Sequence, residues 1–274
     1  MKFAIASKPK EPDVSSIRPQ AHGELSRLNL IFLLALSMLL IFPAASRAQT
    51  APTAEQIAKT YGLDSFGQVE AIRYTWNHAD ASGRKISRTW EWSPKTDTVS
   101  YEGKDKEGKP VKVSYQRSQL SRQSDTVTKE IDPAFANDQY WLLLPFHIVW
   151  DGTTVTDEGT QKLPLGEGSA RRVVVKYPSE GGYQPGDTWE LYVGTDKRIE
   201  EIVYHHHHGA PKSRTVIATF ADYMKAGPLL IATDHRGTAD GKPIRIFFSD
   251  MSVKLAGSDK WVNAQTVGRV HSNG

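Results

Sequence analysis

Two stretches decide the fold, EAIRYTW at residues 70–76 and ISRTWEW at residues 86–92. Aromatic and β-branched residues alternate with polar residues in both stretches, and the apolar positions are Ile72, Tyr74, Trp76, Ile86, Trp90 and Trp92. A period of two puts successive side chains on opposite faces of a strand, so each stretch is expected to bury one face. A turn signal at 82–83 separates them. The pair therefore predicts an antiparallel β-hairpin.

The same rhythm continues along the chain and predicts further strands at 98–102, 111–116, 170–177, 187–194, 198–204, 214–224, 229–235 and 243–255. Short joints at 195–197 and 237–241 favour antiparallel neighbours. In the last strand the apolar residues change face between Phe248 and Met251, which predicts a bulge near Ser249. We expect a strongly twisted sheet of about nine to eleven strands.

Two helices interrupt the strands. Residues 54–61 follow Thr53, a candidate N-cap, and stop at Gly62. Residues 132–144 begin with Asp132-Pro133, and Pro is favoured at the first position of a helix. The expected fold is thus mainly β, a large curved antiparallel sheet or half-barrel covered by one or two helices. The apolar segment 140–150 is expected either to fill the concave face as a helix or to close it as a lid.

The N-terminal region predicts a secretory leader. An apolar run at 30–42 is shorter than a membrane span, and the small residues Ser46 and Ala48 follow it. We expect a signal peptide over residues 1–48, cleaved after Ala48, and a periplasmic protein without a stable transmembrane segment. An uncleaved membrane anchor is the alternative. The mature chain, 49–274, is expected to be one domain, with an irregular tail from about residue 257.

The amino-acid composition argues against several classes of protein. The chain has no Cys, so it has neither structural disulfides nor a lipid-modified N-terminal Cys. Residues 1–48 hold six of the 34 Lys and Arg and three of the 31 Asp and Glu, which leaves 28 of each in the mature chain. A neutral mature chain without blocks of like charge gives no reason to expect a nucleic-acid partner.

No catalytic motif is present. The sequence has no G-x-S-x-G, H-E-x-x-H or phosphate-binding loop, so we expect no enzyme and no cofactor. A hydrolase with scattered Asp and His residues remains the alternative, because carboxylate chemistry needs no local motif.

The run His205–His208 is the most conspicuous local feature of the mature chain. His205 and His207 would share one face of a strand and are the candidate metal ligands. A third ligand would have to come from His147, Asp234 or His235. We expect a solvated hairpin tip without a tightly bound metal.

The mature chain holds all seven Trp residues. Core packing accounts for aromatic residues on strands, but a large sheet covered by few helices is also expected to leave a concave apolar groove. The candidates for lining that groove are Trp76, Trp90, Trp92, Trp141, Phe146 and Trp150.

Two stretches, GDTWELYVGTDKRIEEIVY at 186–204 and IATFADY at 217–223, resemble the LolA-like superfamily of periplasmic lipoprotein carriers and its uncharacterised relatives. The resemblance implies a half-barrel sheet and a non-enzymatic protein that binds a lipid or a lipoprotein acyl chain. It transfers no ligand-contact residue to a position of this chain. A structural protein that binds another protein is a further alternative.

The leader generates a direct prediction. N-terminal sequencing of the protein purified from its own cell envelope is expected to begin at Gln49, because cleavage follows Ala48. Recovery of residues 1–48 on the protein in a membrane fraction would show that the segment is an anchor.

Overall fold

The structure, a computed structural model, describes residues 53–207 and 214–267. These residues belong to one compact unit, residues 51–274. The expected leader lies outside the described residues, and so does His208.

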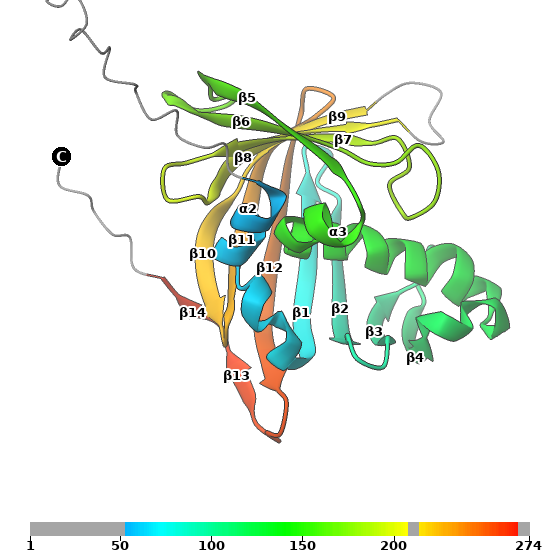
Figure 1. Cartoon of the computed structure of the whole chain (residues 1–274). Helices are drawn as coiled ribbons and strands as arrows, with labels where there is room; N and C mark the ends of the chain where they lie inside the picture. The colour runs from blue at the N-terminus through cyan, green and yellow to red at the C-terminus, as the bar shows by residue number, and fades with distance from the viewer. Residues whose placement is uncertain (1–52, 208–213, 268–274) are drawn as a thin grey trace, which may run out of the picture. The chain divides into compact units, whose positions relative to one another are not determined.

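The described residues of this unit form one antiparallel sheet of 14 strands. The sequence predicted this type of sheet with fewer strands. The main path of neighbouring strands is β4-β3-β2-β1-β12-β11-β9-β8-β7-β6-β5, and β4 and β5 are its two open edges. The sheet twists so strongly that β5–β8 cross the view of Figure 1 at a steep angle to β1–β4. The strands are β1 (Val69–Asp80), β2 (Lys85–Ser93), β3 (Thr98–Lys104), β4 (Pro110–Gln116), β5 (Thr154–Lys162), β6 (Ser169–Lys176), β7 (Thr188–Val193), β8 (Ile199–His206), β9 (Arg214–Thr219), β10 (Ala221–Ala226), β11 (Leu229–Ala239), β12 (Lys242–Leu255), β13 (Trp261–Asn263) and β14 (Gln265–Thr266).

The predicted first hairpin is confirmed. Strands β1 and β2 pair in a register that sets Tyr74 opposite Trp90. The predicted bulge in the last strand is also confirmed, because the pairing of β1 with β12 shifts between Ser249 and Ser252 and Asp250 has a φ of 52°.

The predicted strand 214–224 is two strands, β9 and β10, which break at Phe220. Strand β11 pairs with β10 along its first half and with β9 along its second half. The crossing with β9 is close, since a Cβ built on Gly237 would lie 1.8 Å from the carbonyl oxygen of Ile217. A Gly at this position therefore lets one strand change its neighbour.

Sequence reasoning missed three strands, which is why the sheet exceeds the expected nine to eleven. Strand β5 has a single apolar residue, Val155, and a register shift beside Gly159, so its pattern is not that of a half-buried strand. Strands β13 and β14 lie in the tail that we expected to be irregular. They pair with β12 and β10, and the Arg73 guanidinium lies 4.2 Å from the centre of the Trp261 ring.

The first predicted helix is α2 (Ala54–Thr60), and its start is the capping box of Thr53 and Gln56. A closed ring of hydrogen bonds holds the end of α2 on the sheet. The Ile199 N–H donates to the Tyr61 hydroxyl, Tyr61 donates to the Tyr223 hydroxyl, and Tyr223 donates to the Ile199 carbonyl, over 2.7–2.8 Å. Shorter helical turns occur at η1 (Leu63–Gln68), η2 (Arg117–Arg122) and the π-helix η3 (Val127–Ile131).

The second predicted helix, α3 (Asp132–Trp150), continues through the apolar segment 140–150. It lies across the sheet with α2 beside it (Figure 1), which confirms the predicted covering of the sheet by helices. Fourteen of its nineteen residues are buried. The helix is kinked at Leu143, because Pro145 has no N–H to donate to the carbonyl of Trp141.

A buried carboxylate fixes α3 to the first hairpin. Asp138 is fully buried, and its two oxygens accept from the Arg88 guanidinium at 2.6 and 2.7 Å and from the Trp90 indole N–H at 2.9 Å. Burial raises the pKa of Asp138 above its ordinary value, against the opposing effect of the Arg88 hydrogen bonds. The carboxylate thus depends on these donors to remain stable in the core.

Asp138→Ala is expected to lower the free energy of unfolding by about 3–5 kcal/mol, because it leaves the Arg88 cation and the Trp90 N–H without their hydrogen-bond acceptor. Glu91→Ala is the control, since it removes an ion pair with Arg73 whose side chains are 43% and 38% exposed, and should cost less than about 1 kcal/mol. Urea unfolding of both variants measures the difference. Equal losses would contradict the role of the Asp138 network.

Candidate functional site

A cavity of about 300 Å³ lies between α3 and the concave face of the sheet. Seven elements contribute to its wall, and the lining residues are Trp76, His78, Arg84, Ile86, Asn137, Trp141, Tyr204, His206, Arg214, Val216, Ala239, Ile244 and Ile246. Arg84 and Ala239 lie at the hairpin ends of β1–β2 and β11–β12. The cavity therefore opens at the end of the sheet where these hairpins turn.

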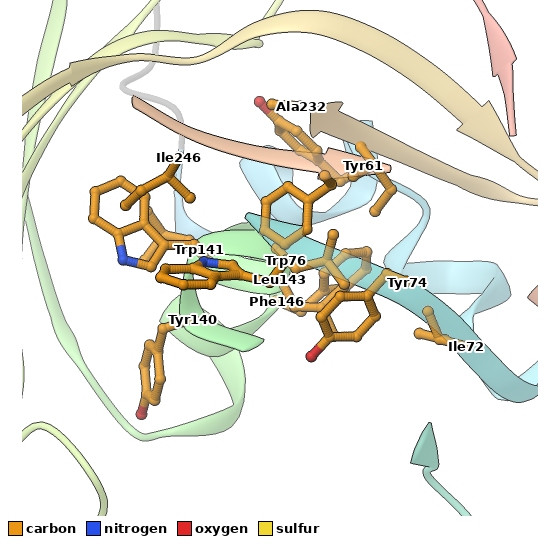
Figure 2. Close-up of a cluster of buried hydrophobic side chains, with 14 of the residues drawn as sticks. Tyr61, Ile72, Tyr74, Trp76, Tyr140, Trp141, Leu143, Phe146, Ala232 and Ile246 are labelled. Atoms are coloured by element: carbon orange, nitrogen blue, oxygen red, sulfur yellow. The ribbon is translucent and has the colours of Figure 1, made fainter. Parts of the chain in front are cut away.

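Two indole rings form much of the apolar wall. Trp76 comes from β1 and Trp141 from α3, and Figure 2 shows both beside Ile246 of β12. Trp76 is held by the Arg88 guanidinium, 4.1 Å from the ring centre, and Trp141 packs edge-on against Trp189. These contacts fix both rings, so the wall is preformed.

The rim of the cavity is cationic. Arg84 and Arg214 line it, whereas none of the lining residues is an Asp or a Glu. The carboxylate partners of these arginines, Asp80 and Asp240, are not among the lining residues, and they lie 3.2 and 3.4 Å from the arginine nitrogens. Each arginine is more than 60% exposed. The rim can therefore offer positive charge to a bound group.

Two buried polar atoms also belong to lining residues. The indole nitrogen of Trp76 and Nδ1 of His78 have no hydrogen-bond partner in the described part of the protein. The two rings stack at 5.8 Å. A ligand that carries a polar group beside its apolar part can satisfy such atoms.

The structure brings together only two of the six predicted groove residues. Trp76 and Trp141 line the cavity. Trp90, Trp92 and Phe146 are buried in the core, where Trp90 and Trp92 pack around Phe135 and Phe146 packs on Phe66. Trp150 is 40% exposed at the end of α3. Alternation gives the face of a strand on which a residue lies, and the distance between two such residues depends on the tertiary fold.

Sequence reasoning missed most of the wall. Ile244 and Ile246 share one face of β12 by their period of two, so that signal was available. Asn137 and Trp141 are four residues apart on α3 and face the same side. Nothing local to Arg84, Arg214 or Ala239 indicates that these residues meet.

A larger hollow of about 1020 Å³ adjoins this cavity, and Arg84 and Ile86 line both. It follows β2, β3 and β4 to the π-helix, and its other charged lining residues include Lys104, Lys106 and Glu130. This mixed polar wall is less suited to an apolar ligand than the smaller cavity is.

The candidate metal ligands have protein partners. His205 lies 2.9 Å from Glu190, and its ring stacks on that of His207 at 6.4 Å. Of the three candidate third ligands, Asp234 pairs with Arg236 and Arg245, His147 pairs with Asp151, and His235 is buried behind Trp141. Over residues 53–207 and 214–267, no group of three or more His, Asp or Glu is arranged to hold a metal ion.

Comparison with known proteins gives likeness in solved structures alone. No protein-family model matches the chain, and no curated protein matches it. A LolA superfamily protein from Nitrosomonas europaea is 10% identical, with a TM-score of 0.43 over 74% of this chain and 94% of that one.

Two other solved structures are similar. A DUF1329 family protein from Desulfovibrio piger is 11% identical, with a TM-score of 0.40 over 75% of this chain and 94% of that one. The Mycobacterium tuberculosis lipoprotein LppX is 11% identical, with a TM-score of 0.29 over 74% and 96%. At these identities and TM-scores, the likeness transfers neither a ligand nor a role to this chain.

Within the described residues, no helix is both long enough and apolar enough to span a membrane.

His235 supports the wall from behind and is sensitive to acid. It is fully buried against Phe220 and Trp141, and burial lowers its pKa to about 4 although the hydrogen bond to the Thr219 carbonyl opposes this. The unfolded chain takes up the proton near pH 6.5. Stability from the neutral ring is therefore complete above pH 6.5 and is lost as the pH falls toward 4.

Between pH 7 and pH 4, the wild-type protein is expected to lose about 3 kcal/mol more unfolding free energy than His235→Gln loses. Other titrating groups act equally in both proteins, so the difference isolates His235. Urea unfolding across this range measures it. Parallel stability curves would show that His235 is not held neutral.

Proposed function

We propose that this protein is a non-enzymatic periplasmic protein that binds an acyl chain with an acidic head group in the cavity between α3 and the sheet. The observation that supports this proposal is the combination of an apolar wall with a cationic rim in one preformed cavity. A lipid or a lipoprotein acyl chain is the ligand class with both features.

Burial of the chain supplies the driving force. Each CH₂ that leaves water for an apolar site contributes roughly 0.8 kcal/mol. Trp76 and Trp141 provide flat apolar surfaces, and Ile244 and Ile246 provide branched ones. The volume of about 300 Å³ is at the lower end of the range for small-molecule sites, which suits a single chain.

The charges support an acidic head group. Arg84 and Arg214 are exposed at the rim, and their ion pairs with Asp80 and Asp240 are surface pairs that can be exchanged for a ligand carboxylate or phosphate. With the acidic head group at the rim, the apolar chain of the ligand would lie against the indole rings of Trp76 and Trp141.

The cavity supports binding better than chemistry. Its lining residues, all within the described part of the chain, include no Ser, Thr, Asp or Glu to act as a nucleophile or a carboxylate base. The hydrolase alternative would rest on His206, which lines the cavity and lies 3.0 Å from Asp187, but without a Ser or Thr nucleophile beside it. Periplasmic location rests on the expected leader and stays part of the proposal.

A cavity-filling variant tests the proposal. Ala239 lines the cavity opposite its strand partner Val216, so Ala239→Phe should occupy space that the chain would use. Binding of dodecanoate, followed by quenching of Trp fluorescence, is expected to weaken at least about tenfold, which corresponds to about 1.4 kcal/mol. Circular dichroism confirms that the variant is folded.

Thr238→Phe is the matched control. Thr238 is the adjacent residue, and it pairs with Ile217, which packs in a small cluster on the opposite face with Ala170, Tyr192 and Val203. This variant should bind dodecanoate like the wild type. Failure of the folded wild-type protein to bind dodecanoate saturably would remove the acyl-chain proposal and favour a protein partner.

A further inference from the structure

A second cavity, of about 280 Å³, lies against another side of α3. Gln139, Tyr140 and His147 of α3 line it together with Asp151, and its other charged lining residues are Arg117 and Glu180, one of each sign. Tyr177 and the loop over residues 178–184 form its outer wall. No residue lines both this cavity and the first cavity, in which the acyl chain is proposed to bind and which is called the acyl cavity below. In Figure 2 the ring of Tyr140 points away from the cluster of Trp141 and Ile246, so the two sites are separate.

The outer wall is fixed by hydrogen bonds. The Tyr183 hydroxyl donates to Asp132 at 2.9 Å, and the Trp189 indole donates to the Gln184 side chain at 2.7 Å. The Gly186 N–H closes the loop on the Pro178 carbonyl at 2.8 Å. The loop is therefore a built wall that is attached to α3 and to the sheet.

Three buried polar atoms of lining residues have no hydrogen-bond partner in the described protein. They are Nε2 of Gln139, Nε2 of His147 and the hydroxyl of Tyr177, on side chains of residues that are 4%, 8% and 7% exposed. Leaving such an atom unpaired is costly, so buried polar atoms almost always find a partner. Three of them on one cavity point to a bound polar group.

Asp151 sets the chemistry of His147. The carboxylate Oδ2 accepts from the Tyr140 hydroxyl at 2.5 Å and lies 3.0 Å from Nδ1 of His147. Burial favours the protonated acid, but the hydrogen bonds from His147 and Tyr140 outweigh it and lower the pKa of Asp151 below its ordinary value. The ionised carboxylate accepts the Nδ1 proton of His147. In the neutral ring, Nε2 therefore presents a lone pair.

This set of atoms requires a particular ligand chemistry. The Gln139 amide nitrogen can only donate, Nε2 of His147 accepts when the imidazole ring is neutral, and the Tyr177 hydroxyl can do either. A carboxylate cannot donate to His147, and an ammonium cannot accept from Gln139. A hydroxyl does both. The ring of Tyr140 stacks on His147 with 4.0 Å between centroids and meets the Tyr177 ring at 5.8 Å, which places the aromatic groups together.

We propose that this second cavity is a binding site for a small neutral hydroxylated molecule, of the polyol or monosaccharide class, held by Gln139, His147 and Tyr177. The site is independent of the acyl cavity, so either proposal stands or fails without the other.

The test uses glycerol, myo-inositol and glucose as probes, acetate as the charged comparison, and the full mature chain. Saturation-transfer NMR measures binding to the wild-type protein and to Tyr177→Phe. This substitution removes only a hydroxyl that has no protein partner, so it should not cost a hydrogen bond in the folded protein. Tyr74→Phe is the matched control, because the Tyr74 hydroxyl is also buried and unpartnered but does not line this cavity.

We expect saturable binding of at least one hydroxylated probe, about tenfold weaker in Tyr177→Phe, unchanged in Tyr74→Phe, and no binding of acetate at this site. A tenfold loss corresponds to one good hydrogen bond. No binding by any hydroxylated probe, equal affinity in the two variants, or tighter binding of acetate would each overturn the inference. The first two results would mean that only water fills the cavity.

Discussion

The packing of α3 into the concave face is the interaction on which the rest of the structure depends. A curved sheet with apolar residues on its inner face cannot bury them alone. The helix supplies the missing surface, and it is apolar on nearly all sides because it meets the sheet and the loop over 178–184 together. Asp138 is one of several buried polar residues of α3, and its bonds to Arg88 and Trp90 set the position of α3 along the first hairpin.

The kink in α3 connects this packing to both proposed sites. Trp141 precedes the kink and lines the first cavity, and the second cavity is lined from both sides of the kink, by Gln139 and Tyr140 before it and by His147 after it. One helix therefore supplies an apolar wall to one site and hydrogen-bonding groups to the other. Of the two alternatives expected for the apolar segment 140–150, the structure shows the first, a helix that fills the concave face of the sheet.

The two cavities differ in the way that they recognise a ligand. The first is bounded by indoles and isoleucines, with charge only at the rim, so affinity comes from apolar area. The second has three buried polar atoms without a partner in the described protein, on Gln139, His147 and Tyr177, so its selectivity comes from hydrogen bonding.

The sequence by itself determined the mainly β fold, the first hairpin, both helices and the bulge near Ser249, because these follow from period-two alternation, caps and turn residues acting over a few positions. It did not reveal β5, whose pattern is polar on both faces, or the split of β9 from β10 at Phe220. Only the tertiary structure decided which aromatic residues meet. Trp76 and Trp90 both lie on the first hairpin, yet Trp76 lines the cavity beside α3 and Trp90 is bonded to Asp138 in the core, since proximity across seven elements depends on the twist of the whole sheet and the placement of α3.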